Sequence, residues 1–285
     1  MRWVFRLIGA VVVIAAIAIG ALFFLPGDRI ARIAADQLSK ATGRTVTLSG
    51  EARISLYPVL GIATGAVEIA NAEWSEAGPM LRAESLRIGV APAALLSGDI
   101  RLTDLEATGP VVRLERAADG RVNWDLRGEA AKAAQGGDAS ASGTALTLDR
   151  ARITDGRLVH TDHATGAVTE LTDLDLGLRW PAYEGPADFD AAFARGGGRV
   201  SVTGTLDAAD RFIDGEVTAV ALTVEAAGGR ASLDGTAGLP PQLQGRLDLE
   251  LPDTGAFLAA LGMGAVDLPQ GIGQSLGGST DLTMT

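Results

Sequence analysis

The sequence has no cysteine, which excludes disulfide bonds and thiolate metal sites. It has only two histidines, His160 and His163, which leaves little for histidine-based catalysis. Aromatic residues make up 5% of the chain, and its pattern lacks long helices that would cover a sheet. The net charge of −11 does not fit the basic surface that binds nucleic acid. We therefore expect no enzymatic activity, no cofactor, no metal and no nucleic-acid partner.

One long apolar run is present, at residues 7–25, and it contains no charged side chain. A helix of this length measures roughly 28 Å, close to the thickness of about 30 Å of a bilayer's hydrocarbon core. Every later apolar run is interrupted within a few positions by Asp, Arg, Gly or Thr. The sequence thus predicts a single-pass membrane protein with one large part outside the bilayer.

Charge alone leaves the direction of this span open. The four basic residues that follow it outnumber the two arginines of residues 1–6, which favours a cytoplasmic body. A short basic segment before a long span is also typical of a signal anchor, with residues 1–6 in the cytoplasm. A cleaved signal peptide is a third reading, since Ala16 and Ala18 have the right spacing. However, the apolar run continues to Leu25, which favours an uncleaved anchor.

After the span, apolar residues recur at helical spacing over residues 28–42 and predict a short amphipathic helix. This helix would lie on the membrane surface, cap the end of a sheet, or do both. Its basic residues Arg29, Arg32 and Lys40 are the predicted membrane-interface residues. They would hold anionic lipid head groups or simply anchor the helix at the interface.

From Arg44 onward the apolar period changes to two, which is typical of strands with one apolar face. We expect the fold to be mainly β, with a second short helix at residues 254–261. Either two sheets cover one another as a sandwich, or one long sheet exposes an apolar groove that a ligand covers. The predicted groove-lining residues are Val46, Leu48, Ile54, Leu56, Leu86, Ile88, Leu146, Leu148, Leu174, Leu176, Leu178, Val200, Val202, Leu247 and Leu249.

Residues 127–143 contain no apolar side chain larger than alanine and are expected to be a flexible linker. The linker separates a β domain at residues 27–126 from its continuation at residues 144–285. The last residues, 278–285, read as the opening half of a strand with no turn or cap after it. We therefore expect the sequence to be a fragment, incomplete at its C-terminus.

Two local motifs invite a functional reading, and both fit a turn better. His160 and His163 have the spacing of metal ligands, but on a strand or turn their side chains point apart, and a third histidine or a cysteine is lacking. Residues 196–198 are three glycines after Arg195, but the lysine and hydroxyl residue of a phosphate-binding loop do not follow. Trp74, Trp124 and Trp180 are expected to pack at sheet edges or to contact lipid or a partner.

A series of short motifs in the first 126 residues resembles the N-terminal region of the AsmA family of bacterial envelope proteins. After the span these motifs are Thr42-Gly43-Arg44, Leu48-Ser49-Gly50, Leu56-Tyr57-Pro58, residues 67–72, Met80-Leu81, residues 95–100, Pro110 and residues 120–124. Each is weak alone, but the order and spacing together are specific. Looser similarity continues at residues 155–158, 162–166, 174–178, 185–186 and 258–262.

This resemblance implies an anchor in the bacterial inner membrane and a body in the periplasm. It implies an elongated, twisted antiparallel sheet similar to the chorein-type bridge proteins, whose apolar groove carries phospholipid acyl chains across the envelope and serves outer-membrane lipid homeostasis. A partner in the periplasm or outer membrane would receive the lipid. It also places Asp162 to Gly166 in a hairpin turn, with His160 at an inward strand position. The alternatives are a scaffold that assists outer-membrane protein assembly without transport, and an anchored β-sandwich that binds sugar or peptide.

Overall fold

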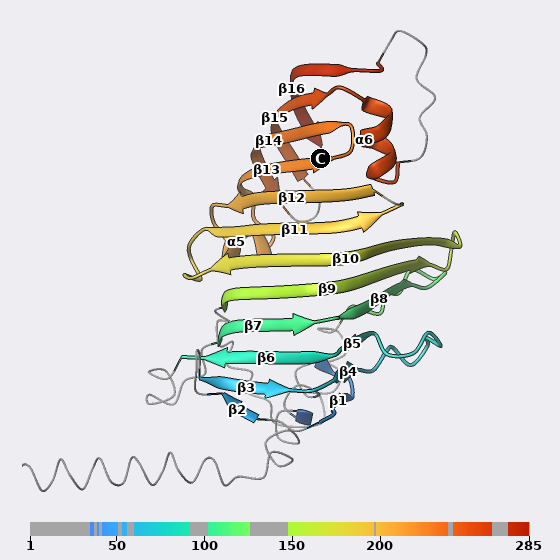
Figure 1. Cartoon of the computed structure of the whole chain (residues 1–285), viewed down its shortest axis with the longest axis vertical. Helices are drawn as coiled ribbons and strands as arrows, with labels where there is room; N and C mark the ends of the chain where they lie inside the picture. The colour runs from blue at the N-terminus through green and yellow to red at the C-terminus, as the bar shows by residue number, and fades with distance from the viewer. Residues whose placement is uncertain are drawn as a thin grey trace, which may run out of the picture.

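The computed structural model describes residues 35–36, 39, 42–50, 53–55, 60–91, 102–125, 148–196, 198–238, 242–263 and 273–284. In this part of the chain all sixteen strands belong to one open sheet, with the strands stacked along the long axis of the molecule (Figure 1). The prediction of a mainly β fold built on one elongated sheet is confirmed. The two facing sheets of a sandwich are not what the described residues form.

The second half of the sheet is a regular antiparallel series in which each strand pairs with the next. Its strands are β9 (Leu148–Asp162), β10 (Ala167–Trp180), β11 (Ala187–Arg195), β12 (Gly198–Leu206), β13 (Thr218–Ala226), β14 (Gly229–Gly238), β15 (Gln242–Leu251) and β16 (Leu276–Met284). Residues 163–166 form the turn between β9 and β10, as the sequence predicts. Apolar and polar residues alternate along these strands because one face of the sheet is apolar and the other contacts water.

The first half of the sheet is made of shorter strands in two branches. One branch pairs β2 (Arg53–Ser55), β3 (Gly61–Thr64), β6 (Ser85–Val90) and β7 (Leu102–Thr108) in that order, and β7 joins the first half of β9. The other pairs β1 (Val46–Leu48), β4 (Val67–Ile69), β5 (Leu81–Ala83) and β8 (Val111–Arg116), and β8 joins the second half of β9. The long strand β9 therefore joins both branches to the rest of the sheet.

A seam of irregular positions separates the two branches and continues into β9 and β10. Gly109, Asp155 and Asp173 lie on this seam with φ values of 56°, 54° and 49°. The pairing register shifts in β10 between Leu171 and Leu174, which still occupy the same face. Since side chains in a strand alternate, residues three apart would normally face opposite ways. Each irregularity thus keeps the apolar residues on one face, as a β-bulge does.

The expectation of a wholly antiparallel sheet is wrong at one place, because β7 and β8 run parallel to β9. Alternation has the same period in parallel and antiparallel strands, so the sequence pattern does not reveal direction. A parallel pair needs a long connection that returns the chain to its starting side. The stretch between Arg116 and Leu148 is long enough for this.

Two short helices accompany the second half of the sheet. Helix α6 (Thr254–Ala260) matches the predicted helix at residues 254–261, and the Asp253 side chain caps it by accepting a hydrogen bond from the Ala256 N–H at 2.8 Å. Helix α5 (Ala209–Ile213) lies between β12 and β13 and was not predicted, because five residues are too few for a helical period to be recognised. The two helices lie at opposite ends of the strands (Figure 1).

Several predictions fall outside the described residues. They concern the span at residues 7–25, the linker at residues 127–143, the groove residues Leu56 and Leu146, and the interface residues Arg29, Arg32 and Lys40. Of the predicted helix at residues 28–42, the described residues 35, 36, 39 and 42 are helical. Among the helices of the described part, none is long and apolar enough to cross a membrane.

Candidate functional site

One face of the sheet is apolar from strand to strand. Paired residues share a face, so Leu176 of β10 lies beside Ile153 of β9 and Ala191 of β11. The same register places the predicted residues Val46, Leu48, Leu86, Ile88, Leu148, Leu174, Leu176, Leu178, Val200, Val202, Leu247 and Leu249 on this face. Ile54 occupies the register position opposite Ile62. The predicted lining is therefore brought together in the described strands, and we refer to this surface as the apolar face.

The opposite face carries the charges. Its ion pairs join neighbouring strands, for example Arg150 with Asp104 at 2.7 Å and Arg87 with Glu106 at 2.8 Å. Such exposed pairs contribute little to stability, but they keep this face wet. Most charged side chains of the described strands thus lie on this face, which we call the charged face.

The centre of the apolar face is open. Leu176, Leu222, Leu247 and Leu249 are only partly buried although they lie in the middle of paired strands. In the second half of the sheet, most fully buried apolar side chains lie near the ends of strands, beside the helices, whereas Leu233 is buried in the middle of β14. A sheet face covered by a second protein layer would bury its central residues. The described residues leave the apolar face available to a ligand.

Helix α5 and the loop after β10 lie along one side of the apolar face. Trp180, Ala187 and Ala209 are buried there, with Leu178 and Leu206 packed against them. The Trp180 indole donates a hydrogen bond to the Tyr183 carbonyl at 3.1 Å, and the two rings stack with centroids 5.4 Å apart. Trp180 thus packs against protein at the end of β10, a strand in the interior of the sheet.

Helix α6 lies along the opposite side of the apolar face. A Cβ atom at Gly198, which shares a face with Val200, would lie 3.3 Å from the Ala260 Cβ, so the helix lies directly over this end of β12. Val200 is fully buried beneath it, and Phe257 is also buried. The Arg195 guanidinium donates a hydrogen bond to the Leu261 carbonyl at 2.7 Å and thereby satisfies the end of the helix. Helices therefore lie beside the apolar face at both ends of β12, in the second half of the sheet.

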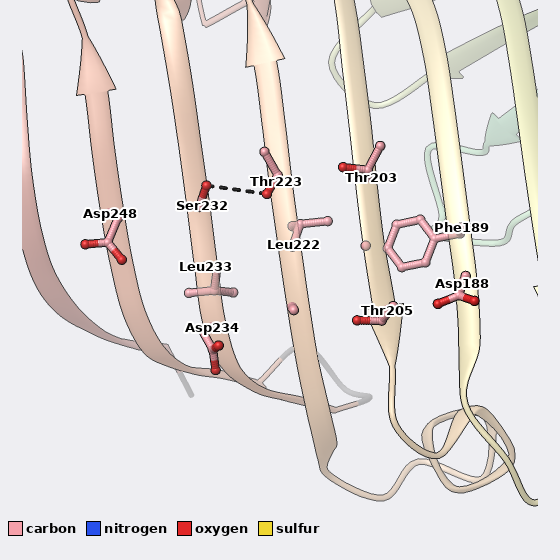
Figure 2. A pocket seen from close by; sticks show the side chains of 12 residues that line it. Asp188, Phe189, Thr203, Thr205, Leu222, Thr223, Ser232, Leu233, Asp234 and Asp248 are labelled. Carbon is pink, nitrogen blue, oxygen red and sulfur yellow. Dashed lines mark hydrogen bonds between the residues drawn. The ribbon is translucent and has the colours of Figure 1, made fainter.

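Between helices α5 and α6, a glycine and a phenylalanine shape the surface of the apolar face. A Cβ atom at Gly204 would lie 2.6 Å from the Phe189 Cζ and 2.6 Å from the Ala221 carbonyl oxygen. Figure 2 shows the Phe189 ring directed from β11 toward β12, where Gly204 lies. Glycine is therefore required at this position for the ring to cover the backbone. The ring adds apolar surface to a face that would otherwise expose main-chain atoms.

A shallow hollow of about 610 Å³ on β11 to β15 is lined by polar side chains of the charged face together with Phe189, Gly204, Leu222 and Leu233 of the apolar face (Figure 2). Asp188, Asp234 and Asp248 line it with Thr223 and Ser232, whose hydroxyls lie 3.4 Å apart. In the described part of the chain, no three histidine or carboxylate groups gather as metal ligands would. These side chains face water, and we assign the hollow no binding role.

A buried polar cluster lies at the end of β8, on the charged face. The Glu115 carboxylate accepts hydrogen bonds from the Ser75 hydroxyl and from the Asn71 amide at 2.8 Å, and it lies 2.9 Å from His163 Nε2. Burial alone would raise the Glu115 pKa, but the contacts with Ser75, His163 and Asn71 together hold this pKa below its ordinary value. These contacts hold the loop between β4 and β5, and the turn between β9 and β10, against β8. Sequence reasoning missed it.

Asn123 lies against the part of the β8 edge that β5 leaves unpaired, and Trp124 follows it in the chain. Asn123 is fully buried, and its amide donates hydrogen bonds to the Asn71 side chain at 2.9 Å and the Arg113 carbonyl at 2.8 Å. The Arg44 guanidinium donates to the Asn123 carbonyl at 3.0 Å. Trp124 contacts His160, with ring centroids 5.9 Å apart, whereas His163 contacts Trp74 at 6.4 Å. The two histidines thus serve different clusters.

Comparison with known proteins gives one match. The sequence model described as "AsmA family" matches residues 3–248, which is most of the chain. The motifs from Thr42 to Trp124 and the looser similarity up to residue 186 lie within this range, whereas residues 258–262 lie beyond it. No curated protein and no solved structure matches the chain.

Proposed function

Since the chain belongs to the AsmA family, we propose that it carries phospholipid acyl chains along its apolar face, between the two membranes of a bacterial envelope. In this proposal residues 7–25 anchor the protein in the inner membrane with residues 1–6 in the cytoplasm, and the sheet extends through the periplasm. A partner in the periplasm or outer membrane receives the lipid. No step requires a catalytic residue or a cofactor.

The observation that carries the proposal is the continuity of the open apolar face across the sheet. Each CH₂ group of an acyl chain gains about 0.8 kcal/mol when it leaves water for an apolar surface. An uninterrupted surface lets the chain move without returning to water, while the head group stays wet beyond the border of the apolar face. The half-buried leucines Leu176, Leu247 and Leu249 provide such a surface.

Photo-crosslinking of the full chain in living cells tests this proposal. A photoreactive residue placed singly at Leu48, Leu176 or Leu249 should capture phospholipid, because these positions share the apolar face in three separate parts of the sheet. Matched controls are Thr203 and Thr223, which lie on the charged face of the same sheet. We expect no lipid adduct at either control.

Two outcomes would contradict the proposal. Capture of protein alone at the three leucine positions would favour a scaffold that assists the assembly of outer-membrane proteins. Equal capture at Thr203 and Thr223 would show that lipid meets the protein without using the apolar face.

A further inference from the structure

Charge is almost completely segregated between the two faces of the sheet. In the described strands, the pairing register places three charged residues on the apolar face, namely Arg116, Asp162 and Arg195. The Arg195 guanidinium donates a hydrogen bond to the Leu261 carbonyl at the end of α6. The other two lie opposite one another at the ends of β8 and β9. An arginine at the border of an uncharged, open face requires an explanation.

Among the described residues, Arg116 keeps most of its hydrogen-bonding capacity. Its side chain is 56% exposed, and the shortest distance from its guanidinium to the Asp162 carboxylate is 4.0 Å, beyond hydrogen-bonding reach. One Asp162 oxygen already accepts the backbone N–H groups of Ala164 and Thr165 at 2.8 and 3.1 Å. The guanidinium therefore retains donors for a further acceptor.

Trp124 and His160 lie beside it at the same border of the apolar face. His160 is paired in register with Leu114, two positions before Arg116, and the Trp124 ring covers His160. Trp124 is 39% exposed. Within the described part of the chain, neither its indole N–H nor the His160 ring makes a hydrogen bond. Leu114, Leu158 and Leu171 continue the apolar face next to these groups.

We propose that Arg116, Trp124 and His160 form a binding site for the phosphate of a phospholipid head group, called here the Arg116 site. An exposed guanidinium, an indole N–H and an imidazole suit a phosphate, and an arginine binds its oxygens through two parallel N–H groups. A tryptophan at the border between apolar and wet surface matches the place where a head group joins its acyl chains. This inference rests on the proposed function, since the acyl chains occupy the apolar face.

The test uses the full chain in cells, with a photoreactive residue at Leu114 beside the site and, in a second strain, at Leu249 in β15. Arg116→Gln should lower the yield of phospholipid adduct at Leu114 about tenfold, the effect of losing a charge-assisted hydrogen bond. The yield at Leu249 should not change. The matched control is Arg246→Gln, an exposed arginine on the charged face that lies 3.5 Å from Asp248. It should change neither yield.

The outcomes separate this inference from the proposed function. An unchanged Leu114 yield in Arg116→Gln, with lipid captured at both positions, overturns the Arg116 site alone. No lipid at either position in the unaltered protein overturns the proposed function as well. Excess inorganic phosphate added to membranes that contain the protein distinguishes the phosphate sources. If the site binds a lipid head group, the phospholipid adduct at Leu114 persists in excess phosphate. If the phosphate abolishes the part of this adduct that depends on Arg116, the site binds free phosphate and the proposed head-group site is overturned.

Discussion

Asn123 completes the edge of β8 by pairing with Glu115 as a neighbouring strand would. Its side-chain oxygen accepts the Glu115 N–H at 2.8 Å, and its own N–H donates to the Glu115 carbonyl at 3.0 Å. An unpaired strand edge exposes donors and acceptors that invite association with other chains. The Asn123 side chain and backbone N–H, together with the adjoining bridge between Arg116 and Val122, therefore replace a strand partner at this edge.

Asn123→Ala should destabilise the protein by about 3 kcal/mol, since it leaves the Glu115 N–H, the Arg113 carbonyl and the Asn71 side chain without their partner. The free energy of unfolding of the full chain, measured in denaturant, checks this. Gln244→Ala on exposed β15 is the control and should change it by less than about 0.5 kcal/mol. Equal effects would show that Asn123 is not structurally required.

The Glu115 cluster should make stability depend on pH. Because folding lowers the Glu115 pKa, this carboxylate contributes stability above its unfolded pKa, and the contribution is lost as pH falls through the folded pKa. Glu115→Gln should therefore be less stable than the unaltered protein near neutral pH, and the difference should shrink in acid. Thermal unfolding at several pH values between about 7 and 3 measures it.

Salt provides the control for this pH dependence. Folding also lowers the pKa of Asp119 through hydrogen bonds from the Arg121 backbone and side chain, but this pair is exposed. Concentrated salt should screen the Asp119 contribution and leave that of the buried Glu115 largely intact. A difference between Glu115→Gln and the unaltered protein that stays constant with pH would contradict the role given to this carboxylate.

The sequence was sufficient to predict one apolar face, because apolar and polar residues alternate along the strands on either side of the irregular positions. It also predicted α6 and the turn after Asp162, since caps and turns depend on local residues. The parallel pairing of β8 with β9 and the closure of β8 by Asn123 were not predictable. The parallel pairing depends on contacts between residues far apart in the chain, and the closure depends on a side-chain hydrogen bond between Asn123 and Glu115. A periodic pattern encodes neither. The Arg116 site likewise becomes visible only when the pairing register is known.

An aspartate placed on the apolar face should have different effects at two positions. Val200 is fully buried under α6, so Val200→Asp should cost more than about 4 kcal/mol and prevent folding. Leu176 lies on the open part of this face, so Leu176→Asp should cost about 1 kcal/mol and still fold. Circular dichroism and denaturant unfolding measure both. A photoreactive residue at Leu178 should nevertheless lose its lipid adduct in Leu176→Asp. Equal unfolding by the two substitutions would mean that the apolar face is a closed core.

The last prediction concerns Asp155, which lies on the seam of irregular positions between the two branches of the sheet. Asp155 is exposed and adopts a φ of 54°, a left-handed conformation that β-branched residues strongly disfavour. Asp155→Val should therefore cost about 1–2 kcal/mol through the backbone alone, whereas Asp155→Gly should be nearly neutral or slightly stabilising. Asp234→Val, at an exposed position of β14 with an ordinary strand φ, is the matched control and should be tolerated, since valine favours strands. Denaturant unfolding of the three variants checks this order. If Asp155→Val were as stable as Asp234→Val, the bulge in β9 would be able to relax. The register that keeps Ile153 and Leu158 on one face would then not depend on the left-handed residue between them.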